Sequence, residues 1–223
     1  CVFRYINEAY DMLIEGVPAI MIENAAKMAG MPVGPLSLND EVAVDLSQKI
    51  MKASIADLGE AAVVPGHMSL INKMVDELDR RGRKNGKGFY EYPAKPAKKF
   101  IWPGLKDLFA QKKPEDVDIE VIKQRLLVTI ALEAARTMEE GIVTDPREAD
   151  VGSILGFGFA PYTGGTLSYI DGMGVKTFVE LCETLAASYG DHFQPTPLLK
   201  EMAAKGETFY GRFDPYGASA KAA

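Results

Sequence analysis

The fold is decided by two stretches of this sequence, CVFRYINEAYDMLIEGV (Cys1 to Val17) and LLVTIALEAARTMEEGI (Leu126 to Ile142). They align without a gap, and the alignment places Gly16 on Gly141. Both have apolar residues at helical spacing and both end in Glu-Gly, which is a common way for a helix to stop. The two stretches therefore predict the same helix twice.

Each copy continues in the same order. A second helix follows, then a corner rich in glycine and proline, and then an aspartate. The corners are GMPVGPLSLND (Gly30 to Asp40) and GFGFAPYTGGTLSYID (Gly156 to Asp171). A shared order of this kind indicates a tandem duplication of one helical unit. The predicted fold class is all-α, with the first repeat in residues 1–92, a Pro/Lys-rich linker in 93–117 and a second, degenerate repeat in 118–223.

Composition is that of a packed globular protein, with 223 residues, 47% hydrophobic and 25% charged. The net charge of -6 argues against a nucleic-acid partner or an anionic membrane surface. No apolar run is long enough to span a bilayer. Two cysteines are too few for a disulfide framework, and the two cysteines and two histidines are too scattered for a zinc site.

The first helix is already under way at Val2, without an N-terminal capping residue or an initiator Met. We therefore expect further residues upstream. Other helices are predicted downstream of it, and the one extended piece is Gly88 to Tyr92. One predicted helix begins after Pro146. The others are Pro18 to Ala29, Leu38 to Leu58, His67 to Arg81, Asp118 to Glu140, Val175 to Ser188 and Thr196 to Ala204. In the helix from Leu38 to Leu58, we expect Val42, Leu46, Ile50 and Ile55 to face inward.

Residues with catalytic potential are few. His67 and His192 lack a serine or cysteine partner at recognisable spacing, so a structural or solvated role is favoured for each.

Two carboxylate pairs, Asp150 with Asp171 and Glu8 with Asp40, could meet in the fold. Capping a helix or bridging a loop is the favoured role for them.

Two glycine-rich segments could in principle face a phosphate. Gly156 to Pro161 lacks the third glycine of a dinucleotide loop and no strand precedes it, so a helix-to-helix corner is favoured. Gly82 to Gly88 combines backbone amides with three cations, which makes it the better phosphate candidate. A solvated turn is favoured even there.

Three ordered motifs resemble the C-terminal part of 3-hydroxyacyl-CoA dehydrogenases, and most closely that of multifunctional fatty acid oxidation proteins that also carry enoyl-CoA hydratase. They are MAGMPVGPLSLNDEVAVD (Met28 to Asp45), GRKNGKGFYEY (Gly82 to Tyr92) and EEGIVTDPREADVGSILGFGFAPYTGGTLSYIDGMG (Glu139 to Gly174). The resemblance implies two all-α repeats, like the C-terminal domain of 6-phosphogluconate dehydrogenase, without the Rossmann domain that precedes them in the family.

The resemblance also implies where the chemistry lies. The polar residue near the substrate carbonyl would lie two positions before Cys1, and the catalytic His and its Glu partner would belong to the missing Rossmann domain, which would bind NAD. No catalytic, cofactor-binding or metal-binding residue is expected within the chain. Pro32 and Leu38 match positions that line the acyl side of the substrate cleft, and Phe3 could contact substrate. Gly34, Gly86, Gly88 and Asp40 look structural, with Asp40 bonding local backbone.

The implied parent oxidises (3S)-3-hydroxyacyl-CoA to 3-oxoacyl-CoA with NAD in fatty acid β-oxidation, and the chain alone is expected to be inactive. Implied partners are the acyl-CoA substrate, upstream Rossmann and hydratase domains, and a homo-oligomer or thiolase-containing complex. The implied compartment is cytoplasmic in bacteria, mitochondrial or peroxisomal in eukaryotes. Two alternatives stay open: a helical interaction or scaffold module without a catalytic parent, and a fragment of a 6-phosphogluconate or related β-hydroxyacid dehydrogenase, which would lack the GRKNGKGFYEY signature.

Overall fold

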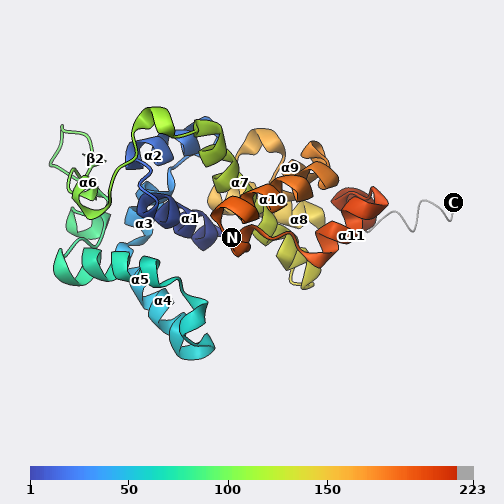
Figure 1. The fold of residues 1–223 in the computed structure, drawn as a ribbon, viewed down its shortest axis with the longest axis horizontal. Helices are drawn as coiled ribbons and strands as arrows, with labels where there is room; N and C mark the ends of the chain where they lie inside the picture. The colour runs from blue at the N-terminus through green and yellow to red at the C-terminus, as the bar shows by residue number, and fades with distance from the viewer. Residues whose placement is uncertain (215–223) are drawn as a thin grey trace. The chain divides into compact units, whose positions relative to one another are not determined.

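A computed structural model describes residues 1–214, which form helices with one very short sheet (Figure 1). This confirms the all-α fold class. The α-helices are α1 (Val2–Ile14), α2 (Ala19–Met28), α3 (Pro35–Val42), α4 (Val44–Leu58), α5 (Pro65–Asn72), α6 (Leu105–Leu108), α7 (Ile119–Glu139), α8 (Pro146–Phe157), α9 (Thr166–Met173), α10 (Val175–Tyr189), α11 (Pro197–Lys205) and α12 (Phe209–Arg212). The strands are β1 (Tyr90–Glu91) and β2 (Phe100–Ile101).

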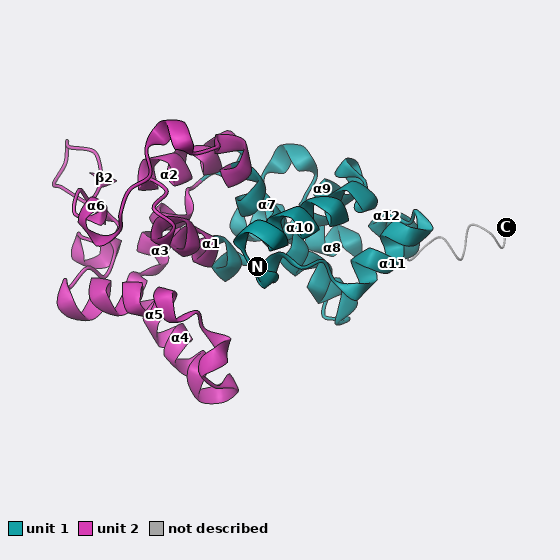
Figure 2. Ribbon diagram, in the orientation of Figure 1, with its two compact units in different colours: residues 1–5, 29–32, 123–223 teal, residues 6–28, 33–122 magenta. Residues whose placement is uncertain are grey.

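The chain divides into two compact units, coloured separately in Figure 2. Unit 1 consists of residues 1–5, 29–32 and 123–223, of which the structure describes those up to 214. Unit 2 consists of residues 6–28 and 33–122. The stretch 93–117, expected as a linker, lies in unit 2. The two structural units therefore differ from the predicted repeats, and the repeat boundaries at 92 and 118 stay a prediction from the sequence.

Glycines end the first helix of each copy as expected. Gly16 follows α1 with φ 88°, and Gly141 follows α7 with φ 68°. Both values lie in the left-handed region that glycine adopts without a steric cost. The two helix stops that the sequence pairs are therefore built in the same way.

The duplication continues into the corner of each copy. α3 and α9 have 8 residues each, and the helices that follow them, α4 and α10, have 15 residues each. A single residue with positive φ separates the two helices in each copy: Ala43 with φ 82° and Gly174 with φ 89°. The conformation is one that glycine adopts readily, and the first copy adopts it with alanine.

The break at Ala43 overturns the prediction of one helix from Leu38 to Leu58. Val44 N donates to Arg81 O at 3.1 Å instead of continuing the helix. The helix after the break also buries a different face from the one predicted. Val42 and Leu46, expected inward, are 37% and 42% exposed. The buried residues of α4 are Val44, Ser47, Gln48 and Met51.

Three other helix predictions need correction. His67 to Arg81 is not one α-helix, because α5 ends at Asn72, a π-helical turn follows over Lys73–Glu77, and Asp79 has φ 49°. α9 lies within what the sequence indicated as a corner, and α12 follows the helix that was expected to be the last. The cap predicted for α11 is confirmed, since Thr196 Oγ1 accepts from Leu199 N at 3.2 Å.

The sheet is a two-stranded antiparallel ribbon that holds the residues after Pro93 against the preceding part of unit 2. Tyr90 pairs with Ile101 and Glu91 with Phe100. Beyond the ribbon, the backbone N–H of Lys112 donates to the carbonyl of Gly16 at 2.8 Å. These contacts give the proline-rich stretch a fixed course over the α1–α2 corner.

Each unit has a core of its own. In unit 1 the core lies between α7, α9, α10 and α11, with Leu132, Phe178 and Leu199 fully buried. In unit 2, Tyr10 stacks on Phe89 at a ring-centroid distance of 5.9 Å, and both rings are fully buried. Within the described residues, no helix is both long and apolar enough to cross a membrane.

Candidate functional site

Unit 2 is organised by two buried acidic side chains, and the first is Glu23 of α2. Its Oε1 accepts hydrogen bonds from the backbone N–H of Leu36 at 2.8 Å and of Ser37 at 3.4 Å. Both amides belong to the first turn of α3, where helix N–H groups have no partner within the helix. Glu23 therefore acts as a cap that reaches α3 from another helix.

The second acid is Asp40 of α3. Its two carboxylate oxygens accept from the backbone N–H of Phe89 and of Tyr90, each at 2.8 Å. The Tyr92 hydroxyl adds a third hydrogen bond at 3.1 Å. The prediction of a structural role for Asp40 is confirmed. Its partners are not local, because they lie 49 to 52 residues away in the sequence.

Tyr90 joins the two acids. Its backbone amide donates to Asp40, and its hydroxyl donates to Glu23 Oε2 at 2.6 Å. The residue that completes the pair with Asp40 is thus Glu23, whereas the sequence suggested Glu8. Nothing in the local sequence pattern marks Glu23, which lies within an ordinary amphipathic helix.

Unit 1 contains the same network. Asp150 of α8 accepts from Leu167 N at 2.7 Å and from Ser168 N at 3.1 Å in the first turn of α9. Asp171 of α9 accepts from Phe209 N at 2.9 Å and from Tyr210 N at 3.1 Å.

The Tyr210 hydroxyl then donates to Asp150 Oδ2 at 2.9 Å, as Tyr90 does to Glu23. The structural role predicted for Asp150 and Asp171 is confirmed. The two Phe-Tyr pairs, Phe89-Tyr90 and Phe209-Tyr210, occupy equivalent places in the two copies. The duplication therefore extends to residues that the first alignment did not reach.

Burial raises the pKa of three of these acids. Glu23 and Asp40 are each 1% exposed. Burial raises the pKa of Asp40 to about 6, although the hydrogen bonds from Phe89 and Tyr90 oppose the shift. Burial likewise raises the pKa of Glu23 and of Asp171 above their ordinary values. Glu23 and Asp40 thus face backbone amides and tyrosine hydroxyls rather than open solvent, which fits a structural role.

The network also explains two of the motif glycines. A side-chain carbon on Gly88 would lie 2.0 Å from Asp40 Oδ1, and one on Gly34 would lie 2.4 Å from the Glu23 carboxylate. Only a residue without Cβ fits at either position. Gly86 differs, because it has open space around it but a φ of 80°.

The cations of the Gly82 to Gly88 loop are paired with carboxylates of the same unit. Arg83 Nη1 lies 2.6 Å from Glu41 Oε2, and Lys87 Nζ lies 3.2 Å from Asp79 Oδ2. Lys84 is hydrogen-bonded to Asp45. This pairing supports the interpretation of the loop as a turn, because its charges are already balanced locally.

The two histidines lie in different settings. His67 is 3% exposed in the first turn of α5, and its Nε2 lies 2.7 Å from Asp11 Oδ1 of α1. The pair ties α5 to α1, which fits the structural role favoured for His67. His192 lies in the short turn before α11, with its ring 4.3 Å from that of Phe193.

The three residues expected to line the substrate cleft are divided between the units. Phe3, which is 36% exposed, and Pro32, which is exposed, belong to unit 1. The half-buried Leu38 belongs to unit 2. Within unit 1, the Pro32 ring covers Gly158 so closely that a Cβ there would lie 2.6 Å from Pro32 Cγ.

This packing shows whether the Gly156 to Pro161 corner could bind the phosphates of NAD. The Gly156 to Pro161 corner is the C-terminal end of α8, where Gly158 has φ 73°, and it is covered by Pro32. Within residues 1–214 the strands are two residues long, so none leads into a phosphate-binding turn. The described residues do not fit a dinucleotide site.

The repeated helical unit, with its acid–tyrosine network, makes the chain an all-α tandem-repeat protein. A family model described as "3-hydroxyacyl-CoA dehydrogenase, C-terminal domain" matches residues 1–92 and again 122–212. The chain belongs to this family, with two copies of its domain in tandem.

The chain is similar to curated relatives that are longer than it is. The chain is 38% identical over 210 residues to the fatty acid oxidation complex subunit alpha of Shewanella sp. (strain MR-7) and 40% identical over 208 residues to that of Shewanella amazonensis. Each match covers 92% of this chain and 29% of the relative. The chain therefore spans less than a third of the length of these curated relatives.

Solved structures show the same fold at low identity. The 3-hydroxybutyryl-CoA dehydrogenase of Escherichia coli K12 superposes with a TM-score of 0.66 at 18% identity, covering 91% of this chain and 58% of that one. The dehydrogenase part of multifunctional enzyme 1 from C. elegans superposes with a TM-score of 0.64 at 20% identity, covering 89% and 45%.

Proposed function

We propose that the chain is the C-terminal portion of an NAD-dependent (3S)-3-hydroxyacyl-CoA dehydrogenase of fatty acid β-oxidation, which oxidises 3-hydroxyacyl-CoA to 3-oxoacyl-CoA. The observation that carries the proposal is the family match in both copies, joined to the network that both copies share. An upstream Rossmann domain binds NAD, which accepts the hydride, and supplies the His base. No observation favours a scaffold module without a catalytic parent.

The role of this portion is to form one wall of the acyl cleft. Pro32, Leu38 and Phe3 are the residues we assign to that wall. Pro32 and Phe3 leave apolar surface exposed, as a wall that meets another domain or a substrate does. The repeat boundaries 1–92, 93–117 and 118–223 are part of the same proposal.

The proposed assembly is supported by the relatives, which are named as subunits of a complex. The parent would carry upstream domains, a hydratase among them, and would join a homo-oligomer or a thiolase-containing complex. In a bacterium its compartment would be the cytoplasm.

The test is an assay of the protein encoded by the complete reading frame, with (3S)-3-hydroxyacyl-CoA and NAD and with NADH formation as readout. A G-x-G-x-x-G motif after a predicted strand upstream of Cys1, together with turnover, would support the proposal. A reading frame that begins at Cys1, or a complete product without turnover, would refute it.

A further inference from the structure

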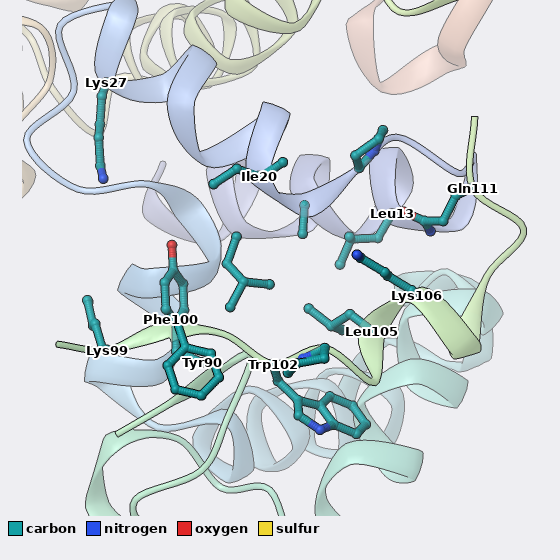
Figure 3. A pocket seen from close by; sticks show the side chains of 14 residues that line it. Leu13, Ile20, Lys27, Tyr90, Lys99, Phe100, Trp102, Leu105, Lys106 and Gln111 are labelled. Atoms are coloured by element: carbon teal, nitrogen blue, oxygen red, sulfur yellow. The ribbon is translucent and has the colours of Figure 1, made fainter. Parts of the chain in front are cut away.

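Unit 2 has a pocket that the proposed function does not use. Its volume is ≈ 530 Å³, and it lies between the α1–α2 corner and residues 99–111. Figure 3 shows its side chains, with Lys27 and Lys106 on opposite sides. None of the residues assigned to the acyl cleft lines it, namely Phe3, Pro32 and Leu38.

A basic stretch of the chain, residues 95–113, runs along this pocket. It contains six lysines and one aspartate, which gives it a net charge of +5. The chain as a whole carries -6, so the residues outside the stretch carry -11. No aspartate or glutamate lines the pocket. A local positive surface on an otherwise acidic chain is complementary to an acidic partner.

The lysines of the basic stretch extend beyond the pocket. Lys99 and Lys106 line it, and the other four lie in the chain before and after these two. Lys112 is fixed beside the α1–α2 corner, because its backbone N–H donates to Gly16 O at 2.8 Å. Positive charge is thus spread over a longer surface than one small head group covers, which favours a polypeptide with several carboxylates.

The lysines differ in how far they are already engaged. Within residues 1–214, Lys106 and Lys112 have no ion-pair partner. Lys99 has Glu41 at 3.9 Å. Lys27 is not part of the proposed contacts, because its charge already acts on the buried Glu23 carboxylate.

The walls of the pocket are mainly apolar and partly in water. Ile20 is 55% exposed and Phe100 is 50% exposed. Trp102, also in the wall, is held by the Arg80 guanidinium, which lies 4.0 Å from its ring centroid. These apolar groups line a hollow, where an inserted side chain reaches them and the flat surface of a bilayer does not. An apolar hollow with a charged rim is a common form of docking site for an anchor residue.

We propose that the pocket and the basic stretch dock an acidic segment of a partner protein. A large apolar side chain of that segment enters the pocket beside Ile20, Phe100 and Trp102. Carboxylates that flank this anchor meet lysines of the basic stretch, Lys106 and Lys112 among them. This binding is independent of the proposed dehydrogenase activity, because it needs only these 223 residues.

The test is a titration of labelled peptides with the 223-residue chain, followed by fluorescence anisotropy. Each peptide has a varied central residue and, on both sides of it, a short run of glutamate, glutamine or lysine. We expect glutamate-flanked peptides with a central leucine or phenylalanine to bind most tightly. Glutamine flanks, or a central serine, should weaken binding about tenfold. Added salt should weaken the glutamate-flanked peptides far more than the glutamine-flanked ones.

Other outcomes overturn the proposal. Equally tight binding of glutamine-flanked or lysine-flanked peptides would remove the role of the basic stretch. Equally tight binding with a central serine would remove the role of the pocket. No saturable binding of any glutamate-flanked peptide would remove the site. Tighter binding of phosphatidylglycerol vesicles or of single-stranded DNA would assign the surface to a membrane or to nucleic acid instead.

Matched lysine variants locate the charged contacts. Lys106→Gln with Lys112→Gln should weaken the glutamate-flanked peptide about three- to tenfold and leave the glutamine-flanked peptide unchanged, since two exposed ion pairs are lost. Lys52→Gln with Lys73→Gln, at exposed positions outside the basic stretch, should leave both unchanged. Equal effects of the two double variants would refute the proposed contacts.

Trp102 reports on the pocket itself, because it is the one tryptophan in the chain. Its emission should change on saturation with the central-leucine peptide and stay constant with the central-serine peptide. Ile20→Gln should weaken the central-leucine peptide about three- to tenfold, whereas Leu58→Gln, at a site that is 78% exposed, should not. Circular dichroism checks that all variants fold. Unchanged binding in Ile20→Gln, with constant Trp102 emission, would refute the pocket as the anchor site.

Discussion

The Tyr90 hydroxyl donates a hydrogen bond of 2.6 Å to Glu23 Oε2, and the backbone amide of the same tyrosine donates to Asp40. Tyr210 makes the equivalent pair of bonds in unit 1, to Asp150 and Asp171. In each unit one tyrosine therefore ties the end of the repeat to the two helices that form its corner. Within residues 1–214 the sheet has two strands of two residues each, so these side-chain hydrogen bonds, rather than a sheet, connect the elements of each corner.

Replacing Tyr90 with phenylalanine should lower the free energy of unfolding by about 1–3 kcal/mol, because the Glu23 carboxylate loses a donor while it stays buried. Tyr210→Phe should cost less, because Tyr210 is 40% exposed and water can replace its hydroxyl. Urea unfolding, monitored by circular dichroism, gives the change in the free energy of unfolding for both variants. Tyr162→Phe, at a site that is 75% exposed, is the control. Equal stabilities for Tyr90→Phe and the control would contradict the role of the network.

The raised pKa of Asp40 predicts a pH dependence of stability. Its pKa is about 6 in the folded chain against an ordinary 3.8, because burial disfavours the charged form. The folded chain thus binds this proton more tightly than the unfolded chain does. The contribution of Asp40 to the free energy of unfolding is fully present below about pH 4 and is lost as the pH rises through about 6. It amounts to about 3 kcal/mol.

Asp40→Asn removes the titrating group and should flatten this part of the profile, whatever it does to the absolute stability. Asp57→Asn, on an exposed position of α4, should leave the slope unchanged. The measurement is urea unfolding at several pH values between about 4 and 7. A slope that persists in Asp40→Asn would assign the proton to another group.

Ala43→Gly should stabilise the chain by about 1 kcal/mol. Ala43 has φ 82° and ψ 126°, a conformation that costs a residue with a Cβ about 1–3 kcal/mol, while glycine itself costs about 0.5–1 kcal/mol of entropy. Ala53→Gly, at an exposed interior position of α4, should instead destabilise by about 1 kcal/mol. Thermal melting of both variants tests the opposite signs, and a loss of stability in Ala43→Gly would contradict strain at this residue.

The sequence predicted the parts of the fold that depend on local pattern. The apolar spacing of α1 and α7, their glycine stops, and the Thr196 cap of α11 all act within a few residues. The break at Ala43 could not be predicted, because no glycine or proline marks it. What enforces it is the contact of Val44 with Arg81, which is distant in the sequence.

The acid–tyrosine network could not be predicted from the sequence for a similar reason. Glu23 and Tyr90 are 67 residues apart, and Asp150 and Tyr210 are 60 apart. One signal was available, namely the recurrence of Phe-Tyr at Phe89 and at Phe209. A pocket of ≈ 530 Å³ lined by Ile20, Phe100 and Trp102 (Figure 3) had even less of a signature in the sequence, because it depends on the course that residues 99–111 take beside the α1–α2 corner.

Leu38→Asp in the complete enzyme should raise KM for long acyl substrates at least tenfold more than KM for a four-carbon substrate. A carboxylate buried beside an acyl chain raises the free energy of substrate binding by roughly several kcal/mol, unless the carboxylate takes up a proton. NAD affinity should be spared. Leu46→Asp, on the 42% exposed side of α4, controls for a general effect of the charge. Equal losses at all chain lengths would place Leu38 in the core and away from the cleft.

A calorimetric titration of NADH into the 223-residue chain and, in parallel, into the protein encoded by the complete reading frame tests most directly whether the cofactor site lies upstream of this chain. We predict no binding to the chain alone up to about millimolar NADH, because its glycine corner is covered by Pro32 and has no strand–turn–helix phosphate site. We predict binding at about micromolar NADH to the complete protein. Micromolar binding to the chain alone, or none to the complete protein, would contradict these predictions.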